Sequence, residues 1–345
     1  LIGKMTDIQR RKQDHIDLAR QPSHQMSMGS EFEHVRFEHI ALPELDLQSI
    51  DMTCTFLGKY CSSPVIIGAM TGGCDEGEAI NRHLAEAAEY CMIPMALGSQ
   101  RAAIELNLRQ NARRWAPNAI LLGNLGATQL AKGGLALAQS AIETISANAL
   151  IIHLNPLQEL AQPSGDHNWT GVLRAIEICC LKLDVPVIVK EVGAGIGPTA
   201  ARSLVDAGVR HIETAGCGGT NWASIELARN PSLREREIMQ PFLNWGMRTF
   251  DLLPLLSDIS GIDEAIDLQL IGSGGIRNGL DVARSIRLGA SMVAMAQPFL
   301  EPAIRSSEAV IEKINIINEQ LRRTMFLTGS ANLDVLRQAK LVQRG

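Results

Sequence analysis

The sequence predicts an α/β protein of the (β/α)8 class. Three observations lead to this fold. Eight short apolar runs recur after residue 60, stretches with helical patterning lie between them, and the runs are continuously rather than alternately hydrophobic. Continuous hydrophobicity is typical of parallel strands covered on both faces, and alternation of strand and helix indicates βαβ units. Eight such units close into a barrel. A doubly wound eight-stranded sheet is the structural alternative.

The eight apolar runs are the expected strands, at 64–69, 94–98, 119–124, 149–154, 186–191, 210–216, 268–273 and 291–296. Helices are expected between them, most clearly at 77–92, 134–147 and 197–208. Residues 1–60 are polar and irregular in pattern, which separates an N-terminal extension from a barrel at 61–345. The connection after the sixth strand, roughly 217–267, is a long insertion, and such insertions are often lids.

Composition excludes several classes of function. The chain has 345 residues, of which 32 are basic and 37 acidic, and no long basic run, so nucleic acid is not an expected partner. No apolar stretch has the length of a membrane span, and the start lacks the apolar core of a signal peptide, so we expect a cytoplasmic protein. The seven cysteines form no CxxC pair, which argues against a zinc site and a disulfide framework.

Polar groups follow the predicted strands, where barrels of this class place their sites. The fourth run ends in "HLNPLQE", which carries His153, Asn155, Gln158 and Glu159 within seven positions. A lone carboxylate beside a phosphorylated substrate suits Mg²⁺, which takes few protein ligands. The alternative for Glu159 is a surface residue that opens a helix.

A glycine-rich loop follows the seventh run, with Gly272, Gly274 and Gly275 in "GSGGIRNG". Glycines allow backbone N–H groups to approach an anion, and the loops after strands seven and eight are the usual phosphate site of this barrel. A plain turn is the alternative.

A ring of possible donors surrounds the predicted barrel mouth, formed by Thr71, Ser99, Asn124 and Lys190. Such a ring above a phosphate site suits a flat heteroaromatic cofactor such as a flavin. For Lys190 a structural salt bridge is the alternative.

Near the N-terminus, "RRKQDH" places Arg11, Lys12 and His15 on one patch if the segment is helical. Three cations suit a diphosphate, whereas a solvated run of charge is the alternative. Cys217, in "AGCGGT", is either a nucleophile or a buried thiol.

With these motifs in order, the sequence resembles the type 2, flavin-dependent isopentenyl-diphosphate isomerases over nearly the full chain. The resemblance rests on "RKQDH" (11–15), "IGAMTGG" (67–73), "GSQR" (98–101), "GNLGA" (123–127), "HLNPLQE" (153–159), "QPSGDHNWTG" (162–171), "VKEVGAGI" (189–196), "GGTNW" (218–222), "NWG" (244–246) and "GSGGIRNGLD" (272–281).

The resemblance implies a TIM barrel that interconverts isopentenyl and dimethylallyl diphosphates in isoprenoid biosynthesis, with reduced FMN, Mg²⁺ and NADPH as the reductant. It also implies a homo-oligomer (tetramer or octamer) and an N-terminal extension that packs on the barrel and contributes to the substrate site.

The resemblance also assigns roles to residues. The flavin ring would contact Ala69, Met70, Thr71, Ser99, Asn124, Lys190 and Thr220, and its phosphate arm Gly274, Gly275, Arg277, Ala296 and Gln297. The substrate would meet Arg11, Lys12, Ser99, Arg101, His153, Asn155, Gln158 and Trp222, and Mg²⁺ would bind Glu159. We expect reduced FMN to act as acid and base, with Gln158 orienting or relaying and His153 assisting.

Two positions depart from the family pattern: Asn244 stands where an acidic residue is common, and "AMAQP" ends the eighth run. Two other functions stay open. An FMN-dependent 2-hydroxyacid oxidase needs a His–Arg pair after the seventh strand, where this chain has "SGGIRNG". An enzyme similar to IMP dehydrogenase would use Cys217 as its nucleophile.

Overall fold

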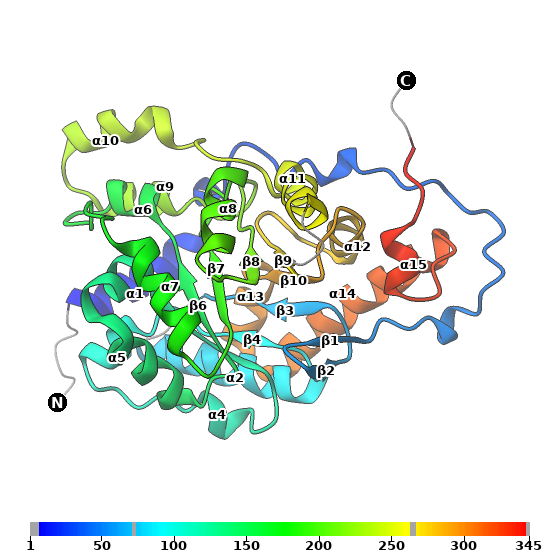
Figure 1. Cartoon of the computed structure of the whole chain (residues 1–345), viewed down its shortest axis with the longest axis horizontal. Coiled ribbons are helices and arrows are strands. Elements are labelled where there is room, and N and C mark those ends of the chain that lie inside the picture. The colour runs from blue at the N-terminus through cyan, green and yellow to red at the C-terminus, as the bar shows by residue number, and fades with distance from the viewer. Residues whose placement is uncertain (1–6, 71–73, 263–266, 343–345) are drawn as a thin grey trace.

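The protein is a closed barrel of eight parallel strands with helices around it (Figure 1). The computed structural model describes residues 7–70, 74–262 and 267–342. The barrel strands are β3 (Val65–Ile67), β4 (Met95–Ala96), β5 (Leu121–Gly126), β6 (Ala149–His153), β7 (Val187–Lys190), β8 (His211–Glu213), β9 (Gln269–Gly272) and β10 (Met292–Met295). All eight overlap the predicted runs. Val293 of β10 pairs with Val65 of β3, which closes the sheet and excludes the doubly wound alternative.

Fifteen α-helices lie in the described part of the chain. They are α1 (Asp7–Ala19), α2 (Asp75–Cys91), α3 (Arg101–Glu105), α4 (Ala112–Trp115), α5 (Ala127–Ile145), α6 (Pro156–Ala161), α7 (Val172–Lys182), α8 (Pro198–Asp206), α9 (Trp222–Arg229), α10 (Leu233–Met239), α11 (Thr249–Ile262), α12 (Gly279–Arg287), α13 (Gln297–Arg305), α14 (Ser307–Leu327) and α15 (Leu333–Arg337). The predicted helix started at residue 134, seven residues after the actual start of α5. The difference arises because Gly134 kinks this helix with a φ of +62°. None of the described helices is long and apolar enough to cross a membrane.

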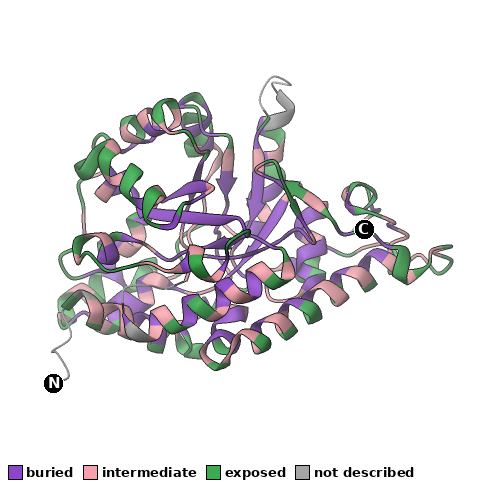
Figure 2. Cartoon of the chain, turned by 90° about the horizontal axis from the view of Figure 1, so that it is seen from below, coloured by how far each residue is buried: buried purple, intermediate pink, exposed green. Residues whose placement is uncertain are grey.

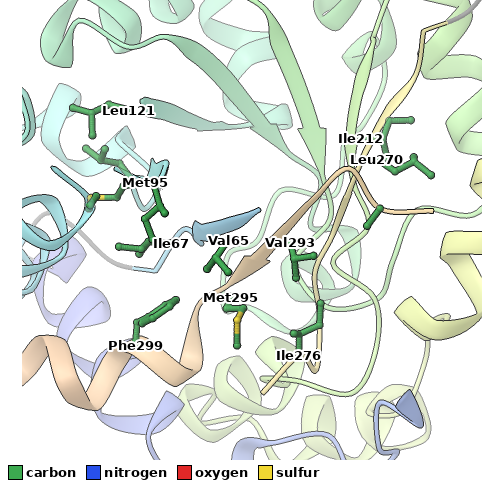
Figure 3. Packing of buried hydrophobic residues seen from close by; sticks show 14 of the residues in the cluster. Val65, Ile67, Met95, Leu121, Ile212, Leu270, Ile276, Val293, Met295 and Phe299 are labelled. Carbon is green, nitrogen blue, oxygen red and sulfur yellow. The ribbon is translucent and has the colours of Figure 1, made fainter. Parts of the chain in front are cut away.

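Apolar side chains of the barrel strands form two layers. One layer fills the barrel interior and includes Ile66, Leu122 and Ile151. The other, which includes Val65 and Ile67, packs between the strands and the helices, as Figure 3 shows. Figure 2 shows the strands buried and the outward helix faces exposed. Because both strand faces are covered, the strands require the continuous hydrophobicity that the sequence displays.

The N-terminal extension is more structured than its sequence pattern predicted. It contains α1, the 3₁₀ helices η1 (Pro22–His24), η2 (Phe32–His34) and η3 (Leu47–Ser49), and the strand β1 (Cys54–Phe56). β1 pairs with β2 (Lys59–Cys61) in a hairpin that crosses the predicted boundary at residue 60. Phe56 meets His211, the first residue of β8, edge to face at 6.2 Å, so the hairpin lies at the strand-start end of the barrel. The helix left open for "RRKQDH" is present as α1, whereas the 3₁₀ helices and the strands of three residues are too short to give a periodic signal.

The extension follows the outside of the barrel between α1 and the hairpin. Backbone hydrogen bonds join Glu38 to Lys340, Ile40 to Leu327 and Asp51 to Ala331. The blue trace in Figure 1 runs toward the C-terminal helices in agreement with these contacts. At its other end, α1 packs against α2 and α9, which places the first helix beside the insertion after β8. That insertion holds α9, α10, the 3₁₀ helix η4 (Gln240–Phe242) and α11.

The Arg113 side chain joins α4 to the loops that precede β5 and β6. Its guanidinium donates to the carbonyl oxygens of Ala116, Ala119 and Ser146 and to the Asn148 side chain, at 2.8 to 3.0 Å. We expect Arg113→Met to lower the free energy of unfolding by about 2–4 kcal/mol, because several buried carbonyls lose a charged donor at once. The neighbouring Arg114 is exposed. Arg114→Met is the control and should change the value by less than about 0.5 kcal/mol. Urea denaturation checks both, and equal effects would contradict this role of Arg113.

Candidate active site

A large cavity opens at the carboxyl ends of the barrel strands. Its volume is about 1550 Å³, counting the open space at its mouth. The residues that the sequence assigned to a site converge on it from α1, from the strand ends and from α9: Arg11, Lys12, Ala69, Met70, Ser99, Arg101, Asn124, His153, Asn155, Gln158, Glu159, Lys190, Thr220, Trp222, Gly274, Gly275, Arg277, Ala296 and Gln297. Thr71 lies outside the described residues.

The orientation of His153 is set by Asn124 on the neighbouring strand. The Asn124 amide donates from Nδ2 to the carbonyl of Leu97, at 2.9 Å, so its Oδ1 faces Nδ1 of His153, at 2.8 Å. The imidazole therefore donates from Nδ1, which leaves Nε2 as an acceptor. Burial, together with the charges of Lys190, Lys12 and Arg11, lowers the pKa of His153 to about 3. His153 is a neutral acceptor in the free protein and offers no positive charge to a diphosphate.

Gln158 lies between the cavity and a buried carboxylate that the sequence analysis did not identify. Its Nε2 donates to Oε1 of Glu226 at 2.9 Å, and its Oε1 accepts from Asn155 at 3.3 Å. Glu226 also accepts from Nε2 of His15, at 2.9 Å, and from Arg229, at 3.0 Å. These partners fix the amide of Gln158 in one orientation.

Glu226 is ionised although it is fully buried. Burial opposes the charge, but the hydrogen bond and charge of His15, the charge of Arg11 and the Gln158 amide outweigh it and lower the pKa of Glu226 to about 2. "WASIELAR" reads as an ordinary helix with a solvated Glu–Arg pair, so only the packing of α1 on α9 reveals this group.

Glu159 is 5% exposed, which excludes the surface alternative. Its Oε1 accepts from Asn155 at 2.9 Å and its Oε2 from the backbone N–H of Asp166 at 2.6 Å. A carboxylate has about four lone-pair sites, so each oxygen retains the capacity to bind a cation. The described residues contain no group of three His, Cys, Asp or Glu side chains that could hold a metal ion. A cation at Glu159 would thus need oxygen ligands from a bound molecule.

Helix α1 supplies two cations to the cavity. His15 binds Glu226, and Asp14 pairs with Arg229 at 2.9 Å, so the helix is held by the same cluster that orients Gln158. Trp222 meets the His15 ring edge to face at 5.2 Å, which places an apolar wall beside the charges. Burial lowers the pKa of Lys12 to about 8, with a further contribution from Arg11.

Lys190 forms the structural salt bridge that was its alternative role and also lines the cavity. Its ammonium lies 3.4 Å from Oε1 of Glu213 and donates to the carbonyl of Glu191 at 2.6 Å. The same side chain lines the cavity, so the ion pair and a ligand contact are compatible. Glu213 is fixed in turn by Ser273 Oγ, at 2.9 Å.

The glycine loop after β9 has the geometry of an anion cradle. Gly274 and Gly275 have φ values of +99° and +74°, and a Cβ on Gly275 would lie 2.6 Å from Ser30, so larger residues do not fit. The Arg277 guanidinium donates to Gln297 Oε1 at 2.6 Å and to Gln25 Oε1 at 2.8 Å. Two neutral amides leave its charge available to an anion such as a phosphate.

Cys217 is fully buried and does not line the cavity. Burial raises its pKa to about 11, and its thiol contacts the carbonyl of Trp245. A protonated thiol away from the cavity is not a nucleophile, so the structure does not support the IMP-dehydrogenase-like alternative.

Comparison with known proteins agrees with this geometry. Residues 166–343 match the family model of FMN-dependent dehydrogenases. The isopentenyl-diphosphate delta-isomerases of Stutzerimonas stutzeri (strain A1501) and Pseudescherichia vulneris are each 46% identical to the chain, with 96% of both partners covered. The chain belongs to the isopentenyl-diphosphate delta-isomerase family. The Nostoc sp. relative of the same name is 41% identical and covers 97% of this chain.

Solved structures show the same fold at low identity. A mandelate oxidase variant has a TM-score of 0.67 at 18% identity, with 98% of this chain and 99% of that chain covered. A flavocytochrome b2 variant has a TM-score of 0.71 at 17% identity, covering 96% and 82%. Because the identities are this low, these neighbours support only the assignment of the barrel fold. The loop after β9 contains Arg277 but no histidine, which argues against the hydroxyacid oxidase alternative.

The lowered pKa of Lys12 predicts how anion binding depends on pH. The free side chain is charged below about pH 8 and neutral above it, and a diphosphate binds the charged form. Affinity for inorganic pyrophosphate should therefore fall, by up to about tenfold per pH unit, as pH rises above 8. In Lys12→Arg the side chain stays charged at both pH values. The loss of pyrophosphate affinity that is due to Lys12 should therefore disappear. Calorimetric titrations at pH 7 and 9 check it, with Lys59→Arg on the distant hairpin as the control. Equal pH dependence in Lys12→Arg and the unaltered protein would contradict it.

Proposed function

We propose that the chain interconverts isopentenyl diphosphate and dimethylallyl diphosphate and uses FMN bound in the cavity at the strand ends. The observation that carries the proposal is the arrangement of that cavity. It combines cations from α1, a glycine cradle with Arg277, and the Gln158–Glu226 pair, which is hydrogen-bonded to α1 through His15. Sequence identity of 46% to isomerases over nearly the full chain supports the same reaction.

The residues present suit FMN. The phosphate would lie at Gly274, Gly275 and Arg277, beside Ala296 and Gln297, where the cradle and the Arg277 guanidinium meet. The ring would lie along Ala69, Met70, Ser99, Asn124, Lys190 and Thr220. When bound and reduced, with NADPH as the electron source, the cofactor would supply an electron-rich ring able to stabilise positive charge and exchange a proton.

The other side of the cavity suits a diphosphate. Arg11 and Lys12 reach it from α1, and Ser99 and Arg101 reach it from the end of β4. Glu159 would hold Mg²⁺, which takes few protein ligands and would neutralise charge on the diphosphate. These contacts would hold the diphosphate and orient the alkene at the barrel mouth.

The protein groups nearest the alkene would manage its protons. Gln158 cannot be a strong acid, but its fixed amide joins the cavity to the ionised carboxylate of Glu226. Glu226 can thus accept a proton that Gln158, or a water beside it, passes from the substrate. Neutral His153 presents Nε2 as a further acceptor. Trp222 excludes water on the hydrocarbon side, which protects a developing carbocation.

The direct test is conversion of isopentenyl diphosphate by the purified protein with reduced FMN and Mg²⁺. Isomerisation should proceed with no stoichiometric consumption of NADPH after the cofactor is reduced. Net hydride consumption with each turnover would reject the isomerase proposal in favour of an oxidoreductase. Light scattering of the same sample measures the homo-oligomer that the resemblance implies.

Gln158→Asn and Glu226→Gln should each lower kcat by about 100-fold or more, because they shorten or neutralise the proton path. For Gln158→Asn, affinity for FMN should change by less than about twofold, since this side chain does not belong to the phosphate cradle and the His15–Glu226 bond that holds α1 stays in place. Glu237→Gln, on exposed α10, is the matched control for Glu226→Gln. Stopped assays and fluorescence titration of FMN measure the two quantities. An unchanged kcat in Gln158→Asn would remove this residue from the chemistry.

Glu159→Gln should raise the Mg²⁺ concentration for half-maximal activity by about tenfold or more, because the only charge on that ligand is lost. Asp166→Asn is the control: it keeps the backbone N–H that holds Glu159 and alters only an exposed ion pair with Lys132. Magnesium titrations of the initial rate compare the two. A larger effect in Asp166→Asn than in Glu159→Gln would place the ion elsewhere.

A further inference from the structure

Gln25 touches both halves of the proposed site without lining the cavity. Its Oε1 accepts from Arg277 Nη2 at 2.8 Å, and its Nε2 donates to the carbonyl of Ala19 at 3.2 Å. Ala19 is the last residue of α1, the helix that carries Arg11 and Lys12. One amide therefore joins the arginine of the phosphate cradle to the end of the helix that supplies the diphosphate cations.

The backbone around Gln25 is fixed, so the side chain is the adjustable link. Met26 N–H donates to Gly219 O, and Asn221 N–H donates to His24 O, both at 2.8 Å. These bonds pair the segment with the loop that carries Thr220, another residue proposed to contact the flavin. The last carbonyls of a helix have no partner within it, so the Gln25 donor satisfies a group that α1 leaves open.

An anion bound at Arg277 would affect the two hydrogen bonds of the Gln25 amide. In the described part of the chain the guanidinium has no carboxylate within ion-pair distance and is held by two neutral amides, so a bound anion would add the strongest of its contacts. A phosphate that holds Arg277 in place also holds Oε1 of Gln25 and, through the same planar amide, Nε2 against Ala19. Coupling between two ligands is reciprocal, so a held α1 favours a held Arg277.

We propose that Gln25 is a positioning residue that couples occupation of the phosphate cradle to the seating of α1 over the substrate side. The proposal rests on the proposed function, because it takes FMN as the molecule in the cradle. It predicts that FMN binding protects α1 and that riboflavin, which has the same ring and no phosphate, does not.

The test measures tryptic cleavage after Arg10, Arg11 and Lys12, all in α1, in the full-length protein. Rates are compared without ligand, with riboflavin and with FMN, each flavin at a saturation set by fluorescence titration. In the unaltered protein FMN should slow cleavage by about fivefold or more, the lower end of typical coupling between sites. Gln25→Leu keeps the shape and removes both hydrogen bonds, so FMN should slow cleavage by less than about twofold.

Gln21→Leu is the matched control, because Gln21 is exposed and its amide contacts only the carbonyl of Asp17. It should retain the full protection by FMN. Gln25→Asn is the second variant should Gln25→Leu not fold, since its shorter amide cannot reach both Ala19 and Arg277. In both Gln25 variants we expect the KM for isopentenyl diphosphate to rise by about threefold to tenfold, with kcat within about twofold.

The outcomes separate this proposal from the function on which it rests. If FMN fails to bind the unaltered protein, the proposed function fails. If FMN binds and protects α1 equally in Gln25→Leu, Gln25→Asn and the unaltered protein, the coupling through Gln25 is overturned. Equal protection by riboflavin would overturn it too, because protection would then not pass through the phosphate cradle.

Discussion

Closure of the barrel is the constraint on which the site depends. Pairing of β10 with β3 brings the carboxyl ends of all eight strands to one rim. Groups separated by more than 140 residues, such as Asn124 and Arg277, then face the same cavity. The interior apolar layer keeps the strands in register, and the outer layer keeps the helices against them. Rigid strand ends hold polar groups more accurately than loops can, which suits a reaction that depends on orientation.

Within that rim, a buried negative charge organises the substrate side. The Glu226 carboxylate is shielded from water. Its negative charge is stabilised because His15, Gln158 and Arg229 replace the hydrogen bonds that water would make. The same bonds fix α1 against α9 and fix the Gln158 amide toward the cavity. One carboxylate therefore serves as an anchor for the N-terminal helix and as a proton acceptor in the proposed reaction. Its removal would disturb both, which is why Gln158→Asn, which leaves the His15–Glu226 bond in place, is the more specific test of the proton path.

The sequence was sufficient for the barrel because burial on two faces leaves a signal in every strand. It was also sufficient for groups at strand ends, such as Lys190, since the fold itself dictates where they meet. Glu226 and Gln25 gave no such signal, because their importance comes from packing between α1 and distant segments. Gln25 looks like any polar residue of an irregular extension until Arg277, far along the chain, is placed beside it. The hairpin at Cys54–Cys61 was missed for a related reason: strands of three residues are too short to show alternation.

The charge state of His153 follows from its neighbours rather than from its own chemistry. Lys190, Lys12 and Arg11 already place positive charge in the cavity, so a second proton on a buried imidazole would be costly. The hydrogen bond from Nδ1 to Asn124 uses the one proton that the neutral ring has. What remains is a lone pair on Nε2, which the oxygens of a bound diphosphate would repel unless a proton or a donor lay between them. A diphosphate that carries a proton, or a water that donates to both, satisfies this condition. In the proposed complex His153 would thus favour one orientation of the substrate by hydrogen bonding, and charge neutralisation would be left to Arg11, Lys12 and a cation on Glu159.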